Sequence, residues 1–228
     1  MSTAVACAMR RAIRVLLWAL LLFLTAAAVA IRLRYGGGKP YPDVTREPLL
    51  PPAALETVVS YHEPIGNVAV SRDGRLFFTV HPEARPEGAK LLEWKNGAAQ
   101  PFPDEAAQDR LFETPLGVVI DRRDRLWVID HGNHGFGTPR LMAFDLGSGA
   151  LVHDHRFPDH IAPLGSFLQD LQVTPDGSRV FIADASFWRQ DPALVVHDVA
   201  NGRDRRLLEH HDSVTAQNWI IVTPSRTM

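Results

Sequence analysis

Acidic residues recur where predicted strands end, and they are the first candidates for chemistry in this sequence. Asp130 closes one strand and is followed by His131, and Asp184 closes a similar strand further along the chain. Such side chains can bind a ligand together, but Asp at these positions also accepts hydrogen bonds from the amides of the following loop. Trp188, in the loop after Asp184, adds an aromatic side chain beside the same place. We therefore predict Asp130, His131, Asp184 and Trp188 as ligand-binding residues, with loop ordering as the alternative role of the two carboxylates.

A second set of oxygen-bearing side chains lies near the starts of predicted inner strands. Its members are Glu63, Asn67 and Asp170. Carboxylate and amide oxygens are the ligands that a hard cation such as Ca²⁺ prefers. The sequence therefore predicts a divalent-cation site at these three residues, and for Asp170 a structural role is equally open.

The ten histidines raise the possibility of zinc. His131 and His134 flank a glycine-rich loop, and His153 and His155 are two residues apart, so they share one face of a strand. No set matches a closed zinc site, and Cys7, the single cysteine, lies outside the predicted strands. We therefore expect histidines on the surface or in loops. The sequence also lacks a G-x-S-x-G nucleophile elbow, a P-loop and a G-x-G-x-x-G fingerprint.

These residues belong to a segment that occurs three times. The copies begin at Gly66, Leu116 and Gln169, and their equivalent positions Val70, Ile120 and Val173 are 50 and 53 residues apart. Each copy has a short alternating strand, a polar turn and a strand that is apolar on both faces. That pattern predicts a hairpin whose second strand is covered on both sides.

A second hairpin follows each copy, which gives four strands per repeat. Four-stranded units that recur every 40–50 residues are typical of a β-propeller. We therefore predict an all-β chain of the propeller type, with a β-sandwich as the alternative. The predicted blades lie near residues 60–103, 110–158 and 165–212, within a partial propeller over 55–219.

The first 34 residues have a different character. Val15 to Ile31 carry no charge, and arginines lie on both sides of this run. This pattern predicts a signal anchor or a cleaved signal peptide, with a buried core helix as the less favoured alternative. Residues 35–54 are rich in Gly and Pro and are expected to form a tether. The remainder would then be extracytoplasmic, either secreted or held at the membrane by residues 15–31.

Charge argues against nucleic acid as a partner. Residues 1–34 hold five arginines and no acidic residue, so the rest of the chain has 19 basic against 26 acidic residues. Phosphate binding needs a basic surface, which this composition does not favour. The oligomeric state is left open.

Several motifs together resemble the yellow/major royal jelly protein family. They are LWVIDHG at Leu126–Gly132, PRLMAFDLGSGALVHDHRFP at Pro139–Pro158, QDLQVTPDGSRVFIADAS at Gln169–Ser186 and LVVHDV at Leu194–Val199. The resemblance implies a six-bladed β-propeller, usually exported, and some bacterial members are called dopachrome-tautomerase-related. A more distant similarity to the senescence-marker/gluconolactonase propellers implies lactone hydrolysis with a divalent metal in the central channel.

These observations predict an exported propeller that binds a small molecule at its central channel. A metal-dependent lactonase and a non-catalytic interaction propeller of the cell envelope are the two alternatives. Three repeats fall short of the roughly four to eight blades that close a propeller, and residues 220–228 resume no blade pattern. We therefore expect an incomplete propeller of three to four blades, as in a truncated product or a fragment.

Overall fold

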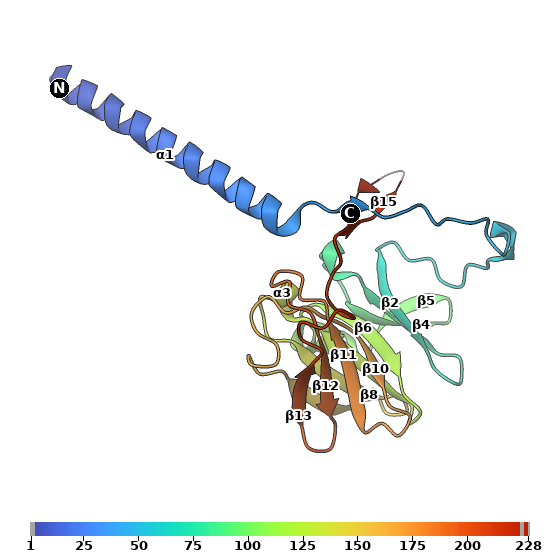
Figure 1. Ribbon diagram of the computed structural model, residues 1–228. Helices are drawn as coiled ribbons and strands as arrows, with labels where there is room; N and C mark the ends of the chain where they lie inside the picture. The colour runs from blue at the N-terminus through green and yellow to red at the C-terminus, as the bar shows by residue number, and fades with distance from the viewer. Residues whose placement is uncertain (1–2, 224–225, 228) are drawn as a thin grey trace. The chain divides into compact units, whose positions relative to one another are not determined.

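The computed structural model describes residues 3–223 and 226–227 (Figure 1). The chain forms two compact units. One runs from Leu50 to Thr215, and the other combines the residues up to Leu49 with those from Ala216 onward.

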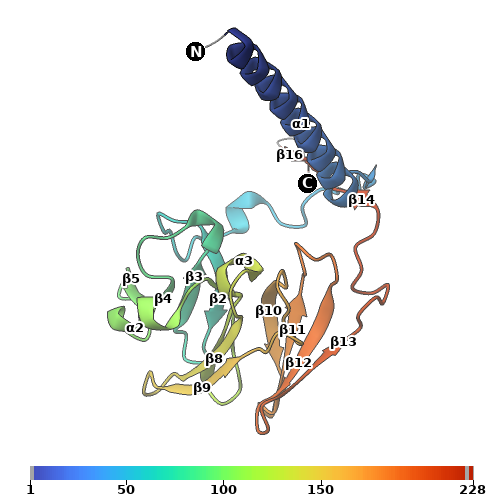
Figure 2. The same cartoon turned by 90° about the vertical axis from the view of Figure 1, so that its left-hand side faces the viewer.

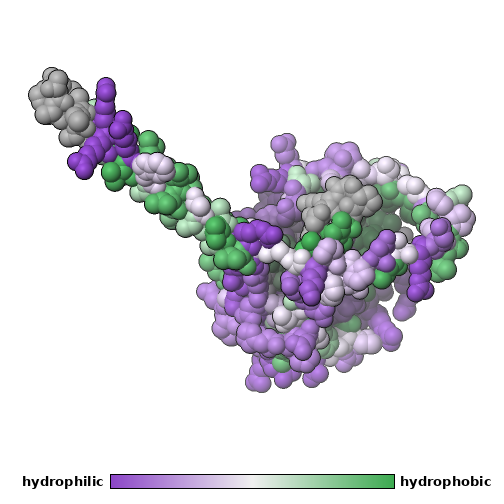
Figure 3. Space-filling model, turned by 45° about the horizontal axis from the view of Figure 1, so that its top comes forward, coloured by the Kyte–Doolittle hydropathy of each residue, from purple (hydrophilic) through white to green (hydrophobic). Residues whose placement is uncertain are grey.

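The smaller unit contains the apolar N-terminal helix. Helix α1 extends over Thr3–Tyr35, and its stretch Met9–Tyr35 is long and apolar enough to cross a membrane. Figure 3 shows apolar side chains along most of this helix. In the same unit, β1 (Lys39–Pro40) pairs in parallel with β14 (Trp219–Ile220), and the Tyr41 and Trp219 rings meet edge to face at 5.6 Å. Strands β15 (Val222–Thr223) and β16 (Arg226–Thr227) form a two-stranded ladder.

The larger unit consists mainly of three four-stranded antiparallel sheets, which we call blades 1 to 3. In each blade the strands pair in chain order. Blade 1 is β2 (Ile65–Val70), β3 (Leu76–Val80), β4 (Leu91–Lys95) and β5 (Ala98–Pro101); blade 2 is β6 (Pro115–Ile120), β7 (Arg125–Asp130), β8 (Arg140–Asp145) and β9 (Leu151–Arg156); blade 3 is β10 (Leu168–Val173), β11 (Arg179–Asp184), β12 (Ala193–Asp198) and β13 (Arg203–Leu207).

The first hairpin of each blade forms where the sequence predicts it. Gly74 and Gly177 adopt left-handed conformations in the turns of blades 1 and 3, with φ of +86° and +67°. Asp124 takes a similar φ of +53° in blade 2, which Asp tolerates better than most residues. Hydroxyl and carboxylate side chains at the turn then bind the free amides, as Asp121 does for those of Arg123 and Arg125.

Short helices interrupt the β structure, and the sequence pattern does not predict them. They are η1 (Pro52–Ala54), η2 (Pro82–Ala84), α2 (Glu105–Leu111) and α3 (Gly132–Gly135). The side chain of Asp104 caps α2 by accepting from the Ala107 amide at 2.8 Å. Buried Gln108 of α2 then accepts from the amides of Lys90 and Leu91, so tertiary contacts with β4 hold this helix.

The blades pack face to face, and the second strand of blade 2 lies between two cores. Leu126 and Val128 of β7 belong to the core shared with blade 1, whereas Trp127 and Ile129 belong to the core shared with blade 3. All four are fully buried, which confirms for blade 2 the prediction of a strand covered on both sides. In β11 of blade 3 the prediction holds for one face only, because Val180 and Ile182 are buried whereas Ala183 is exposed. The inner strand β6 contacts both β2 and β10. Figure 2 shows the three sheets in sequence, and the arrangement is propeller-like.

Arginines at equivalent positions connect successive blades. The guanidinium of Arg75 lies 4.9 Å from the ring of Phe77 and donates to the carbonyl oxygen of Leu146 in blade 2. Arg125 lies 4.9 Å from the ring of Trp127 and donates to the carbonyl oxygen of Gly177 in blade 3. Arg179 holds the same position in blade 3. In blades 1 and 2 this arginine therefore ties its own sheet to the next one along the chain.

Candidate functional site

A pocket of about 580 Å³ lies where the loops after the second strands of the blades meet. Helices η2 and α3 and the loops flanking blade 3 line it. Its lining includes the side chains of His81, Glu83, His131, His134, Phe167 and Trp188. Two other hollows, of 540 and 520 Å³, lie along the turns and outer strands and lack such aromatic residues. The loop pocket is therefore the best candidate for a binding site.

Asp130 and Asp184 lie beneath these loops and hold them in place. Each side chain is 98 % buried, with an exposed fraction of 2 %. Asp130 accepts hydrogen bonds from the amides of Glu113, Thr114 and Gly132, at 2.6 to 3.0 Å. These contacts are those of a carboxylate that orders the loop after its strand.

Asp184 orders the equivalent loop of blade 3 and also forms an ion pair. It accepts from the amides of Phe167 at 2.7 Å and Ser186 at 2.8 Å. Arg206 of β13 completes the environment with an ion pair of 2.7 Å. The equivalent residue in blade 1 is Val80, so this blade lacks the carboxylate altogether.

His131 is the buried polar group of the pocket. Its side chain is 1 % exposed and its ring lies 4.5 Å from that of Phe167. Burial, reinforced by the nearby His134, lowers its pKa to about 4, so the imidazole is neutral near pH 7. Nδ1 accepts from the amide of His134 at 3.0 Å, which places the proton on Nε2. Nε2 has no hydrogen-bond partner among the described residues. His131 thus offers an unused N–H donor.

The loop after His131 has a left-handed backbone conformation that L-amino acids rarely adopt. Asn133 and His134 have φ of 44° and 57°, and they stand between Gly132 at +62° and Gly135 at +85°. A left-handed conformation costs roughly 1–2 kcal/mol for a residue with a Cβ. It persists here because Asp130 and His131 accept from the amides of Gly132 and His134. Strain of this kind concentrates at ligand-binding loops.

Three exposed aromatic side chains form one wall beside the pocket. Trp188 and Phe136 approach each other with ring centroids 5.7 Å apart, and Phe187 meets Trp188 edge to face at 4.9 Å. Their exposed fractions are between 42 % and 60 %. The indole of Trp188 donates to the carbonyl oxygen of His134 at 3.1 Å, which fixes the wall to the left-handed turn.

A histidine and a glutamate complete the rim. His134 Nδ1 lies 3.2 Å from a carboxylate oxygen of Glu83, and the Glu83 amide donates to His81. The pocket therefore combines an aromatic wall, a buried neutral donor and a His–Glu pair that is open to solvent.

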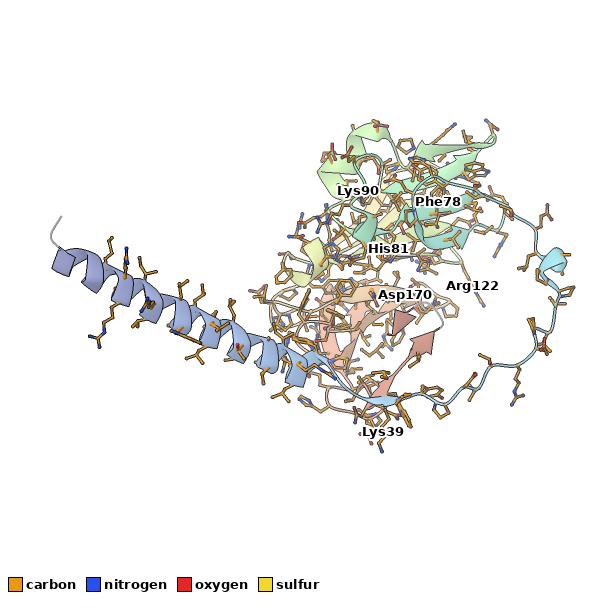
Figure 4. The ribbon with its side chains drawn as sticks, turned by 90° about the horizontal axis from the view of Figure 1, so that it is seen from above. Lys39, Phe78, His81, Lys90, Arg122 and Asp170 are labelled. Atoms are coloured by element: carbon orange, nitrogen blue, oxygen red, sulfur yellow. The ribbon has the colours of Figure 1, made fainter. Side chains whose placement is uncertain are left out.

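The predicted cation ligands lie on other parts of the larger unit. Asn67 lies at an irregularity of the β2–β3 register, and its backbone N–H donates to the hydroxyl oxygen of Thr79. Asp170 is exposed on β10 and accepts from the amide of Leu171 (Figure 4). Glu63 is half-buried and lies 3.7 Å from His62. Their oxygen atoms suit Ca²⁺ chemically, but together they would supply at most about five of the six to eight ligands it takes.

Several residues of the site were not singled out from sequence. Phe167 and Glu83 come from loops of different blades, and no local pattern marks them. The expectation of surface histidines is wrong for His197, which is fully buried, and for the half-buried His153 and His155. The signal available was the alternation of His153 and His155 on one face of a strand, with a third histidine in the strand LVVHDV.

Comparison with known proteins confirms the family resemblance over half of the larger unit. The model of the family described as Major royal jelly protein matches residues 114–218, which contain blades 2 and 3. No curated protein gives a match.

Several solved structures are similar to part of the chain at low identity. A gluconolactonase of Xanthomonas campestris shares 16 % identity over 65 % of this chain and 49 % of its own, with a TM-score of 0.43. The periplasmic gluconolactonase of Pseudomonas aeruginosa shares 15 % over 57 % and 38 %, with a TM-score of 0.36. Hydrazine synthase of Kuenenia stuttgartiensis shares 14 % over 63 % and 37 %, with a TM-score of 0.43. The chain spans at most about half the length of these structures.

Proposed function

We propose that this chain, whose blades 2 and 3 match the royal jelly family model, binds a flat, oxygen-bearing small molecule in the loop pocket. The observation that carries the proposal is the buried N–H of His131, which has no partner within the described part of the chain and lies next to an exposed wall of three aromatic rings. Aromatic rings recognise flat apolar surfaces, and one well-placed donor orients an oxygen atom. The strained turn between them fits a binding role.

The same pocket offers a group for proton transfer. His134 lies at the rim and pairs with Glu83, so a proton can pass between its ring and a ligand while Glu83 stabilises the charge. His131, with its pKa of about 4, would instead donate a hydrogen bond to a carbonyl oxygen. A tautomerase-like isomerisation is the activity that His134 and His131 together support best, with His134 moving the proton and His131 binding the carbonyl oxygen.

Binding can be tested with 4-hydroxybenzaldehyde, an aromatic probe with a carbonyl acceptor. We expect saturation-transfer NMR signals from its ring with the full chain in detergent. The signals should weaken at least tenfold in Trp188→Ala and in His131→Phe. Trp219→Ala is the matched control, because Trp219 is 43 % exposed, as Trp188 is at 42 %, but belongs to the smaller unit. Equal signals from all variants would refute the assignment of the pocket.

A metal-dependent lactonase is the alternative, and it would use Glu63, Asn67 and Asp170. Water or substrate would have to complete their coordination of Ca²⁺. Lactone hydrolysis that depends on Ca²⁺ and disappears in Asp170→Ala would favour it. A non-catalytic envelope protein is expected to bind the aromatic probe without converting any substrate.

We also propose that α1 anchors the protein in a membrane, with the blades on the extracytoplasmic side. The apolar stretch Met9–Tyr35 supports the anchor. Charge does not favour either orientation, because three basic residues lie on each side of the uncharged run Val15 to Ile31. A cleaved signal peptide is the other outcome of the same sequence.

The outer face of blade 1 is covered in part, because Val59 and Tyr61 pack on its buried residue Phe78. Finally, we propose that a further blade-like sheet covers the exposed part of this face. Val68 and Val70 of β2 are 53 % and 59 % exposed on the face opposite to blade 2. Exposed apolar sheet faces of this kind mark interaction sites. In this proposal the described blades are part of a closed propeller.

A further inference from the structure

A cluster of three histidines and one aspartate lies between the outer strands of blades 2 and 3, on elements that do not line the loop pocket. His153 and His155 are on β9, His197 is on β12 and Asp204 is on β13. Alternation along β9 puts both of its histidines on one face, and His197 and Asp204 are direct partners across the β12–β13 ladder. The topology thus brings four polar side chains from two blades together.

The Asp204 carboxylate is the centre of the cluster. Its Oδ1 lies 2.8 Å from Nδ1 of His197, and its Oδ2 lies 2.8 Å from Nε2 of His155. These ligand atoms all lie within 4.8 Å of one another, and among the described residues this is the single group of three or more His, Cys, Asp or Glu side chains that converges in this way. Two nitrogens and one oxygen at such spacing can share one ion.

Burial distinguishes this cluster from a surface group. The side chains of His197, Asp204 and His155 are 0 %, 4 % and 19 % exposed. The rings of Trp127 and Phe157 pack against His153 and His155, at 5.2 and 4.9 Å. Apolar walls of this kind exclude competing water, and of these three side chains that of His155 is the most exposed.

The fourth residue orients one of the three. His153 Nε2 lies 3.0 Å from Nε2 of His197, the ring nitrogen that faces away from Asp204. When Nδ1 of His197 binds a metal, its proton sits on Nε2 and donates to the neutral ring of His153. Histidines that bind metals almost always donate their other N–H to such a partner.

We propose that His155 Nε2, His197 Nδ1 and the Asp204 carboxylate bind Zn²⁺. Two imidazoles and one carboxylate form a zinc set that leaves one tetrahedral position for water, whereas Ca²⁺ and Mg²⁺ prefer oxygen ligands. The bound ion joins the outer edge of blade 2 to that of blade 3, and it acts there as a structural clamp.

The test uses the full chain in detergent, with a tag that contains no histidine and after treatment with EDTA. Co²⁺ serves as the spectroscopic probe, because in a tetrahedral site it gives strong visible absorption. We expect one equivalent of Co²⁺ to produce this spectrum, one equivalent of Zn²⁺ to abolish it, and Zn²⁺ to raise the Tm. Wild-type protein without the tetrahedral spectrum would overturn the proposal.

Variants then assign the ligands. His155→Gln keeps a donor for Asp204 and should fold, yet it should lose the Co²⁺ spectrum and the Zn²⁺-dependent rise in Tm. His153→Gln retains all three ligands and should weaken Zn²⁺ binding by about 10–100-fold. His211→Ala, at an exposed position, is the matched control and should bind as the wild type does. Wild-type affinity in both His155→Gln and Asp204→Asn would contradict the proposed site.

Discussion

At the scale of single residues, burial gives similar side chains different tasks. His131 and His134 are three positions apart, yet one is a buried neutral donor and the other lies at the pocket rim beside the Glu83 carboxylate. Asp130 and Asp184 look like ligand residues in the sequence, and in the fold their oxygens hold backbone amides. The chemistry of a residue type therefore follows from which of its atoms remain unused.

The buried imidazole predicts a loss of stability in acid. The pKa of His131 falls from 6.5 to about 4 on folding, so the folded state favours the neutral ring. This contribution is complete above about pH 6.5 and is lost as the pH falls toward 4. We expect His131→Asn, whose amide oxygen can replace Nδ1 as an acceptor, to unfold with a weaker pH dependence between pH 6.5 and 4.

Urea unfolding at several pH values measures this effect. His153, whose pKa burial also lowers to about 4, keeps part of the dependence in the variant. The control is His211→Ala, in which an exposed ring is removed. The same slope in wild type and His131→Asn would show that His131 is not the group involved.

At the scale of elements, local signals predict the strands well and the pocket poorly. The hairpins follow from alternation and from turns such as Asp73-Gly74, which act over a few residues. Helix α2 depends on Gln108, which binds strand β4, and the turn of α3 depends on Asp130 below it. The pocket residues Phe167 and Glu83 meet only because separate loops converge.

The left-handed turn predicts an unequal cost for two glycine substitutions. A Cβ at Gly135 would clash with the carbonyl oxygen of Ser166, and its φ of +85° is itself unfavourable for alanine. Gly202 has a φ of +63° with nothing within 4 Å of the added Cβ. We expect Gly202→Ala to cost about 1–2 kcal/mol and Gly135→Ala to cost more, with loss of probe binding. Equal free energies of unfolding would mean that the turn tolerates displacement.

At the scale of the whole molecule, the two units have different surfaces. Figure 3 shows the apolar exterior of α1, whereas the core of the larger unit lies between its blades. The propeller type follows from the repeat in the sequence, because the same turn and strand pattern recurs at a nearly constant spacing. What covers the outer face of blade 1 is set by long-range packing, which no local pattern reveals.

The exposed valines Val68 and Val70 on the outer face of blade 1 predict an effect on association. If another sheet covers them, the full chain in detergent should sediment as more than one copy, and the variant carrying Val68→Lys and Val70→Lys should sediment as a monomer. Val152→Lys is the matched control, because Val152 is 51 % exposed on β9 of blade 2. A wild-type monomer that the double substitution leaves unchanged would speak against a second copy on this face.

The single cysteine predicts how the N-terminus can be followed. Cys7 precedes the apolar stretch, so a membrane-impermeant maleimide should not label it in intact cells when α1 is an anchor. A Ser178→Cys variant that also carries Cys7→Ser should be labelled, because position 178 is exposed in a turn of blade 3. Mature protein in which Cys7 stays unlabelled even after denaturation would indicate a cleaved signal peptide.

The order of strands within each blade has a consequence for how the chain folds. Every four-stranded ladder is built from one contiguous segment, and no strand is exchanged between blades. Because the chain is synthesised from its N-terminus, each sheet can therefore form before the segment that makes the next sheet has been synthesised. Contacts over short sequence separation favour rapid folding. Only the side-chain packing between blades and the hydrogen bonds of the bridging arginines require that the next blade has formed. Arg75 and Arg125 would then each donate a hydrogen bond to a carbonyl oxygen that is synthesised later, and so attach each new blade to the one before it.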